Sequence, residues 1–331
     1  MNLDLLERKN KYSNGFCHWP RVAWIKPDGS WQPSTANFTS LADPKAVGSG
    51  HRALTTLMHE AGHAAHFANI KQPSPLFGQE HPPFSAALAE GQSMFLDALV
   101  DDAAWRAKYA LDLDGNPIPF DIIEEEIRAT QPFKVRRLRA MLTVPYFEKA
   151  LYELADDEVT TERIQELADE VEKKIQGGLG PRPLLSVPHI ISDEASCYYH
   201  AYRDGYIVDN PKVGPTLADA YWKYGNERPF LELIKELTGK ELSGAAWVSS
   251  LQTGIDDHVQ KERKEYDASV REMQKKRACN GESKQEAAGE EEPDLKMTIR
   301  FLDGDVLIAD SSEAGGVLQA CQVFESFVGK K

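Results

Sequence analysis

The chain lacks the features of membrane-spanning, secreted and disulfide-rich proteins. It has no run of the ~18 apolar residues that a membrane span needs, and its start, MNLDLLERKNKYSNG, contains no apolar signal segment. The four cysteines, Cys17, Cys197, Cys279 and Cys321, lie far apart, so no CxxC pair indicates a thiolate metal site or a redox motif. We therefore expect a cytoplasmic protein with no membrane partner.

Positive charge is also scarce. The sequence has 38 Lys and Arg against 52 Asp and Glu, which gives a formal net charge of -14. An acidic surface repels phosphate backbones, so nucleic acid is not an expected partner. Hydrophobic residues make up 41% of the 331 residues, which is enough for an ordinary globular core.

The spacing of apolar residues predicts a mainly α-helical protein. A turn at Pro27-Asp28-Gly29, between aromatic and β-branched residues, predicts an N-terminal β-hairpin. From His51 to Ile70 the apolar residues follow a helical period. After a loop rich in Pro and Gly, a second helix is expected from about Pro83 through Ala110, because proline suits a first helical turn.

The most specific chemical motif is HExxH, in His59-Glu60-Ala61-Gly62-His63. Helical residues four apart lie on one face, so both imidazoles can reach one metal ion. Glu60 lies about 100° around the helix, beside the ion rather than on it. From there its carboxylate can take a proton from a metal-activated water. Two unrelated surface histidines are the alternative, but Leu57 and Met58 indicate a buried helix, where an unpaired glutamate would be costly.

A catalytic zinc site needs a third protein ligand. Asn69 stands where the HExxHxxGxxH type has a histidine, which excludes that type. Glu90, on the next predicted helix, is the best candidate, and Asp101 and Asp102 are rivals on spacing alone. We therefore predict one zinc ion held by His59, His63 and Glu90.

Two further residues near this motif have open roles. Asp97 lies two turns after Glu90 on the same face and either orients a ligating imidazole or is a solvated helix acid. His66 lies one turn beyond His63 and either hydrogen-bonds near the site or is an ordinary helix-face histidine.

These motifs resemble the zinc oligopeptidases of the thimet oligopeptidase and oligoendopeptidase F type. HEAGHAAH matches that family's HExGHxxH, and AEGQSMFLDAL is similar to its E-x-x-S-x-F-x-E-A-L, with Asp97 in place of the final glutamate. Upstream, RKNKYSNGFC and STANFT resemble the opening of the family's catalytic region and its strand beside the bound peptide. The resemblance implies peptide substrates, one Zn²⁺ and Glu60 as the base.

Downstream, His189 and the pair Tyr198-Tyr199 resemble the family's oxyanion-supporting segment. The family has another tyrosine three residues after the first of its pair, whereas Tyr202 lies three after Tyr199 and four after Tyr198. The register is therefore open by one residue. The resemblance assigns oxyanion support to His189, Tyr199 and Tyr202, since phenol and imidazole donors suit such a transition state. Core packing on a helix is the alternative for the tyrosines.

The resemblance covers about Lys9 to Leu251, roughly the catalytic half of family members, which are about twice as long. In the family an N-terminal helical half forms one wall of the substrate channel. We therefore expect an open cleft here, and a surface that a partner chain or a second copy could cover.

The sequence thus predicts four segments and one principal function. Residues 1–255 are expected to form a helical, zincin-like catalytic domain with a small N-terminal hairpin or sheet, and residues 256–278 a charged helix. Residues 279–296 read as a disordered linker, and 297–331 as a short α+β tail of unassigned role. The predicted function is zinc-dependent hydrolysis of short peptides. The alternatives are a catalytically silent zinc-binding scaffold or partner subunit, and a helical structural protein without metal.

Overall fold

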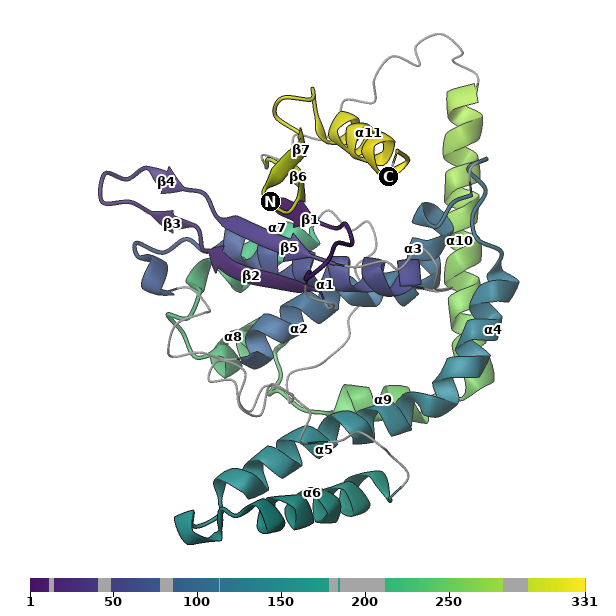
Figure 1. Cartoon of the computed structure of the whole chain (residues 1–331). Helices are drawn as coiled ribbons and strands as arrows, with labels where there is room; N and C mark the ends of the chain where they lie inside the picture. Colours follow the sequence, from purple (N-terminus) through teal and green to yellow (C-terminus); the bar gives the residue numbers. More distant parts are fainter. Residues whose placement is uncertain are drawn as a thin grey trace.

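The computed structural model describes residues 1–11, 15–40, 49–77, 86–112, 114–178, 184, 212–281 and 297–330. Helices dominate these residues, and one small mixed sheet lies beside them (Figure 1), so the predicted mainly α class is confirmed. None of the helices in these ranges is both long and apolar enough to cross a membrane.

The main sheet has five strands in the order β2-β5-β1-β6-β7. Its strands are β1 (Asn2–Asp4), β2 (Phe16–Arg21), β5 (Thr35–Thr39), β6 (Arg300–Asp303) and β7 (Val306–Asp310). Strand β1 runs parallel to both β5 and β6, while β2 and β7 pair antiparallel at the two edges. Side chains alternate along β5, so Ala36 and Phe38 face the core.

A separate hairpin is formed by β3 (Trp24–Ile25) and β4 (Trp31–Gln32). Its turn lies at the predicted place. The Asp28 carboxylate accepts hydrogen bonds from the Ser30 backbone N–H and hydroxyl at 2.9 and 2.6 Å. Gly29 has φ 79°, a conformation that glycine adopts without steric cost. The predicted hairpin is therefore confirmed.

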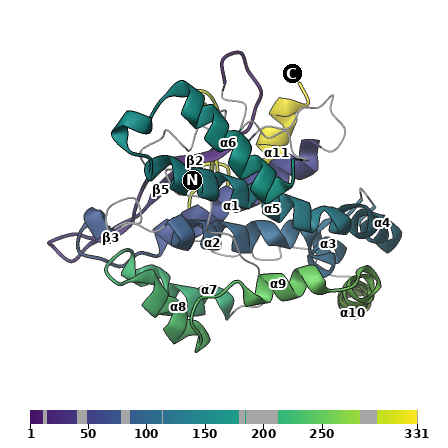
Figure 2. The same cartoon turned by 90° about the horizontal axis from the view of Figure 1, so that it is seen from below.

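Helix α1 (Ser49–Ala68) contacts β2 and β5 on one side and α2 (Ala86–Asp97) on the other. Figures 1 and 2 both show α1 and α2 running side by side. Leu57, Ala61 and Ala64 of α1 pack into the core that also contains Leu3 and Phe38 of the sheet. The helical period thus places one stripe of α1 against the sheet and leaves another facing α2.

The predicted helix from Pro83 through Ala110 is wrong as one continuous element. Helix α2 ends at Asp97, the 3-10 turn η2 (Ala98–Asp101) follows, and α3 (Ala103–Tyr109) begins anew. Asp102 lies between them with an extended backbone, φ -76° and ψ 125°, and its carboxylate accepts from the Trp105 N–H at 2.8 Å. An aspartate in this conformation caps a new helix and ends the previous one.

The remaining elements surround this centre. They are η1 (Pro75–Phe77), α4 (Phe120–Thr130), η3 (Gln131–Phe133), α5 (Lys134–Tyr152), η4 (Asp156–Glu158), α6 (Thr161–Gln176), α7 (Val213–Ala220), η8 (Trp222–Tyr224), α8 (Phe230–Thr238), α9 (Ala245–Gln252) and α10 (Ile255–Gly281). Helices α5 and α6 form a hairpin with its own core around Phe147. Helix α10, the predicted charged helix, packs along α3 and α4 (Figure 1).

The C-terminal tail has the predicted two strands and helix, which are β6, β7 and α11 (Val317–Val328). Its position was not predicted, because β6 joins the main sheet beside β1. Phe301 of β6 stacks on Phe324 of α11 with ring centroids 4.7 Å apart, and both contribute to the core that α1 shares. Residues 279–281 of the predicted linker belong to α10, and 282–296 lie outside the described residues. The four-segment division itself stays a proposal.

Candidate active site

Helix α1 carries three of the predicted site residues within about one turn. His59 and His63 lie four residues apart, and their ring centroids are 5.1 Å apart with the planes at 85°. Glu60 follows His59 and is 7% exposed. The helical spacing therefore places both imidazoles on the face of α1 that meets α2, with Glu60 beside them.

Helix α2 brings Glu90 to these imidazoles. Glu90 Oε2 lies 3.1 Å from His59 Nε2, and Glu90 Oε1 lies 3.4 Å from His63 Nε2. One ligand atom from each of the three residues lies within 4.8 Å of the others. The buried Ser93 hydroxyl donates to the Glu90 carboxylate at 3.1 Å and to the Glu90 carbonyl at 2.9 Å, so it helps to orient the carboxylate.

Asp97 makes the contact that one of its two predicted roles requires. Its Oδ2 lies 2.9 Å from His59 Nδ1. Because Nδ1 is engaged there, His59 Nε2 is directed at Glu90 and is the nitrogen left for an ion. Asp97 is thus in hydrogen-bond contact with a candidate ligand rather than solvated.

The close approach of α1 and α2 depends on Gly62. A Cβ atom at this position would lie 2.6 Å from Ser93 Cα and 2.9 Å from the Gln92 carbonyl oxygen. Both are backbone atoms of α2, so neither can move without displacing that helix. Since Glu90 is on α2, the missing side chain at Gly62 lets the carboxylate reach the imidazoles.

We expect Gly62→Ala to weaken metal binding and to lower stability by about 1–3 kcal/mol, the usual range for overpacking. Gly50→Ala in the same helix is the matched control, because a Cβ there has nothing within 4 Å. Alanine favours helices over glycine, so this control should be neutral or stabilising by up to ~1 kcal/mol. Thermal unfolding and metal titration of the two variants measure both effects. Equal behaviour of the two variants would contradict this role of Gly62.

The buried imidazoles and carboxylates of the cluster stabilise each other's charges. Burial alone lowers the pKa of His59, but the hydrogen bonds to Asp97 and Glu90 outweigh it and raise that pKa to about 10. Burial alone raises the pKa of Glu90, but hydrogen bonds from His59 and His63 outweigh it and hold the pKa far below its usual value. A positive charge is thus stabilised between carboxylates, which is the environment that a divalent cation requires.

Glu60 differs from Glu90 in its contacts. Burial raises the pKa of the Glu60 carboxyl, and the nearby His63 and His59 offset part of that rise. The backbone N–H of Cys17 in β2 donates to its carboxylate. This contact was not predicted, because nothing in the sequence pairs an edge-strand amide with a helix residue.

Comparison with known families identifies the family of this chain. The model of peptidase family M3 matches residues 1–253. The chain belongs to peptidase family M3. Its members are zinc metallopeptidases, so the resemblance seen in the motifs is confirmed. No curated protein sequence gives a significant match.

Two solved structures are similar to this M3 chain at low identity. Metallocarboxypeptidase 1 of Trypanosoma cruzi is 17% identical over 66% of this chain and 52% of its own, with a TM-score of 0.49. The protein described as oligoendopeptidase F of Bacillus anthracis strain Ames is 16% identical over 78% of this chain and 41% of its own, with a TM-score of 0.45. The chain thus matches about half or less of the length of these proteins, and its family membership rests on the family model.

The donor set of this M3 chain fits a catalytic zinc ion. Two imidazoles and one carboxylate are a usual protein ligand set for such an ion. The three residues come together from two helices, and each is already oriented toward the others. Within the described residues, the sequence-based choice of His59, His63 and Glu90 agrees with this geometry.

The two rival acids lie away from this cluster. Asp101 contacts Arg106 and His51, and Asp102 caps α3. His189, Tyr198, Tyr199 and Tyr202 lie outside the described residues, so their predicted roles stay proposals.

His66 is a core residue of the M3 chain. It is fully buried beside Phe67, Tyr221 and Trp222, with ring centroids 5.6, 6.0 and 6.5 Å away. Burial lowers its pKa to about 3, so the ring is neutral. The sequence left two roles open for His66, a hydrogen bond near the site or an ordinary position on the helix face. Core packing among aromatic rings was not one of them. Two of these three neighbours, Tyr221 and Trp222, lie more than 150 positions away in the sequence, which local spacing does not reveal.

Proposed function

We propose that the chain is a zinc metallopeptidase that hydrolyses peptide bonds of short peptides. The observation that supports it is the convergence of His59, His63 and Glu90 within 4.8 Å, with Glu60 buried alongside. His59, His63 and Glu90 would hold one zinc ion, and Asp97 would fix the orientation of His59. When bound, zinc supplies a Lewis acid that polarises the peptide carbonyl and makes water more acidic.

Glu60 acts as the general base in this proposal. Its carboxylate takes a proton from the attacking water and delivers it to the nitrogen of the leaving amine. Burial and the Cys17 N–H hold the carboxylate in one place, which favours proton transfer over a short distance. His189 and one or two of Tyr198, Tyr199 and Tyr202 are proposed to donate hydrogen bonds to the oxyanion.

The test measures zinc content and cleavage of a short, internally quenched peptide by the full chain. We expect one zinc per chain, loss of cleavage after treatment with a chelator, and recovery on adding zinc back. Cleavage that is indifferent to the chelator would contradict the proposal. Stoichiometric zinc without cleavage of a varied set of short peptides would instead favour a catalytically silent scaffold.

A further inference from the structure

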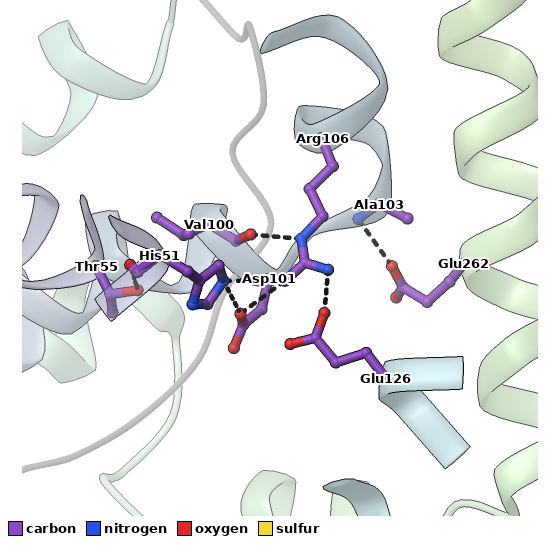
Figure 3. Close-up of polar contacts among 8 residues, drawn as sticks. All are labelled: His51, Thr55, Val100, Asp101, Ala103, Arg106, Glu126 and Glu262. Atoms are coloured by element: carbon purple, nitrogen blue, oxygen red, sulfur yellow. Dashed lines mark hydrogen bonds and ion pairs between the residues drawn. The ribbon is translucent and has the colours of Figure 1, made fainter. Parts of the chain in front are cut away.

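A second polar cluster surrounds the guanidinium of Arg106. Figure 3 shows this group in contact with residues of three other elements, α1, η2 and α4. The Arg106 side chain is only 7% exposed. Its Nε donates to the Val100 carbonyl at 2.7 Å, and its two terminal nitrogens donate to Glu126 at 2.5 Å, Asp101 at 3.1 Å and His51 Nε2 at 3.2 Å. The guanidinium therefore uses all three of its nitrogens.

By spacing alone, His51, Asp101 and Glu126 could also be metal ligands. The Arg106 cation, however, already lies among them and donates to each. A planar guanidinium carries five donors in a fixed fork and keeps its charge at every accessible pH. The cluster thus contains its own cation, and the residues serve to join elements rather than to bind an ion.

One of the joined elements carries metal-centre residues, and another directly follows a helix that does. His51 is on α1, two turns before His59. Val100 and Asp101 are in η2, which directly follows Asp97 at the end of α2. Glu126, by contrast, belongs to α4, which contributes no residue to the metal centre. Arg106 therefore bridges α1 and η2, while the His59–Asp97 hydrogen bond joins α1 to the end of α2, which η2 directly follows.

We infer that Arg106 is a positioning residue for the metal centre: by linking His51 of α1 to η2, it fixes the Asp97 carboxylate against His59. The inference rests on the proposed zinc site. Arginine suits this position because its fork reaches a backbone carbonyl, a carboxylate and an imidazole at once. An ammonium or an amide at this position can bond only part of that set.

The experiment compares the partners of Arg106 by their effect on zinc affinity in the full chain, measured by competition with a chelator. Arg106→Gln should weaken zinc binding by about tenfold, the low end for residues that orient a ligand indirectly. His51→Ala, which breaks the link to α1 only, should weaken it by a smaller factor of about three. Glu126→Gln, which breaks the link to α4 only, should leave zinc affinity within about twofold of wild type while lowering the unfolding temperature.

A double variant separates positioning from general stability. If Arg106 acts through Asp97, then Asp97→Asn with Arg106→Gln should bind zinc no more weakly than Asp97→Asn alone. Additive losses would overturn the inference, as would equal effects of His51→Ala and Glu126→Gln. His51 is exposed and Glu126 is half-buried, so these two variants should fold and can be compared even if Arg106→Gln does not fold. If the wild-type chain bound no zinc, the proposed zinc site would be wrong as well. Failure of the zinc site is therefore distinguishable from failure of the positioning role of Arg106.

Discussion

Replacing His63 with alanine is expected to abolish stoichiometric zinc binding. The variant would keep one imidazole and one carboxylate from the cluster, one ligand fewer than a catalytic zinc site needs. It would also leave the buried Glu90 without one of its two imidazole partners, which adds an electrostatic penalty. The measurement is zinc content after dialysis against a weak chelator.

His258→Ala is the matched control for this change. His258 lies on α10, where its Nδ1 is 2.6 Å from the Gln131 side chain. It does not belong to the cluster of His59, His63 and Glu90. The control should retain one zinc per chain. Unchanged zinc content in the His63 variant would remove His63 from the proposed ligand set.

Glu60→Gln should keep zinc and lose at least ~100-fold in kcat/KM, the usual contribution of a positioned base. Glutamine has nearly the same volume, and its amide oxygen can still accept the Cys17 N–H, so the local structure should survive. What is lost is the capacity to take a proton. The variant should therefore bind zinc normally in the same assay that detects the loss in His63→Ala.

The pH dependence of the wild-type chain provides a second measurement for Glu60. A base must be ionised to act, so activity should fall as pH drops through the Glu60 pKa. Burial raises that pKa in the metal-free chain, whereas the charge of a bound zinc ion would lower it, so the position of the acid limb measures the balance of these two effects. Near-normal cleavage by Glu60→Gln at any pH would exclude Glu60 as the base.

The sequence was most informative where function depends on spacing within one helix. His59, Glu60 and His63 are ordered by the 3.6-residue period, which needs no tertiary information. Glu90 and Asp97 could be proposed because they lie seven residues apart on the next helix. Their distances to His59 depend on Gly62, whose role appears only once α1 and α2 are packed.

The contacts that escaped prediction are long-range or compete with a local preference. The sequence between Pro83 and Ala110 favours helix almost throughout, yet Asp102 interrupts it by capping α3. Arg106 has four polar contacts from three other segments, and no local pattern indicates which acceptors a buried guanidinium will find. The residues of the C-terminal tail predict its two strands, but they do not indicate that β6 pairs with β1.

The order of the strands in the main sheet has a consequence for folding during synthesis. The Met1 amino group donates to the Thr298 carbonyl across a sequence separation of 297 residues, at the point where β1 meets β6. Contacts this distant form slowly, because the chain entropy is lost before the contacts are gained. On the ribosome, α1 is complete long before Phe301 and Ala320, which share its core, have been made. The side of this core that Phe301 and Ala320 cover therefore stays open until the tail is made, although Leu3 and Phe38 are already present, and the nascent chain is most prone to aggregate or to bind chaperones in that interval.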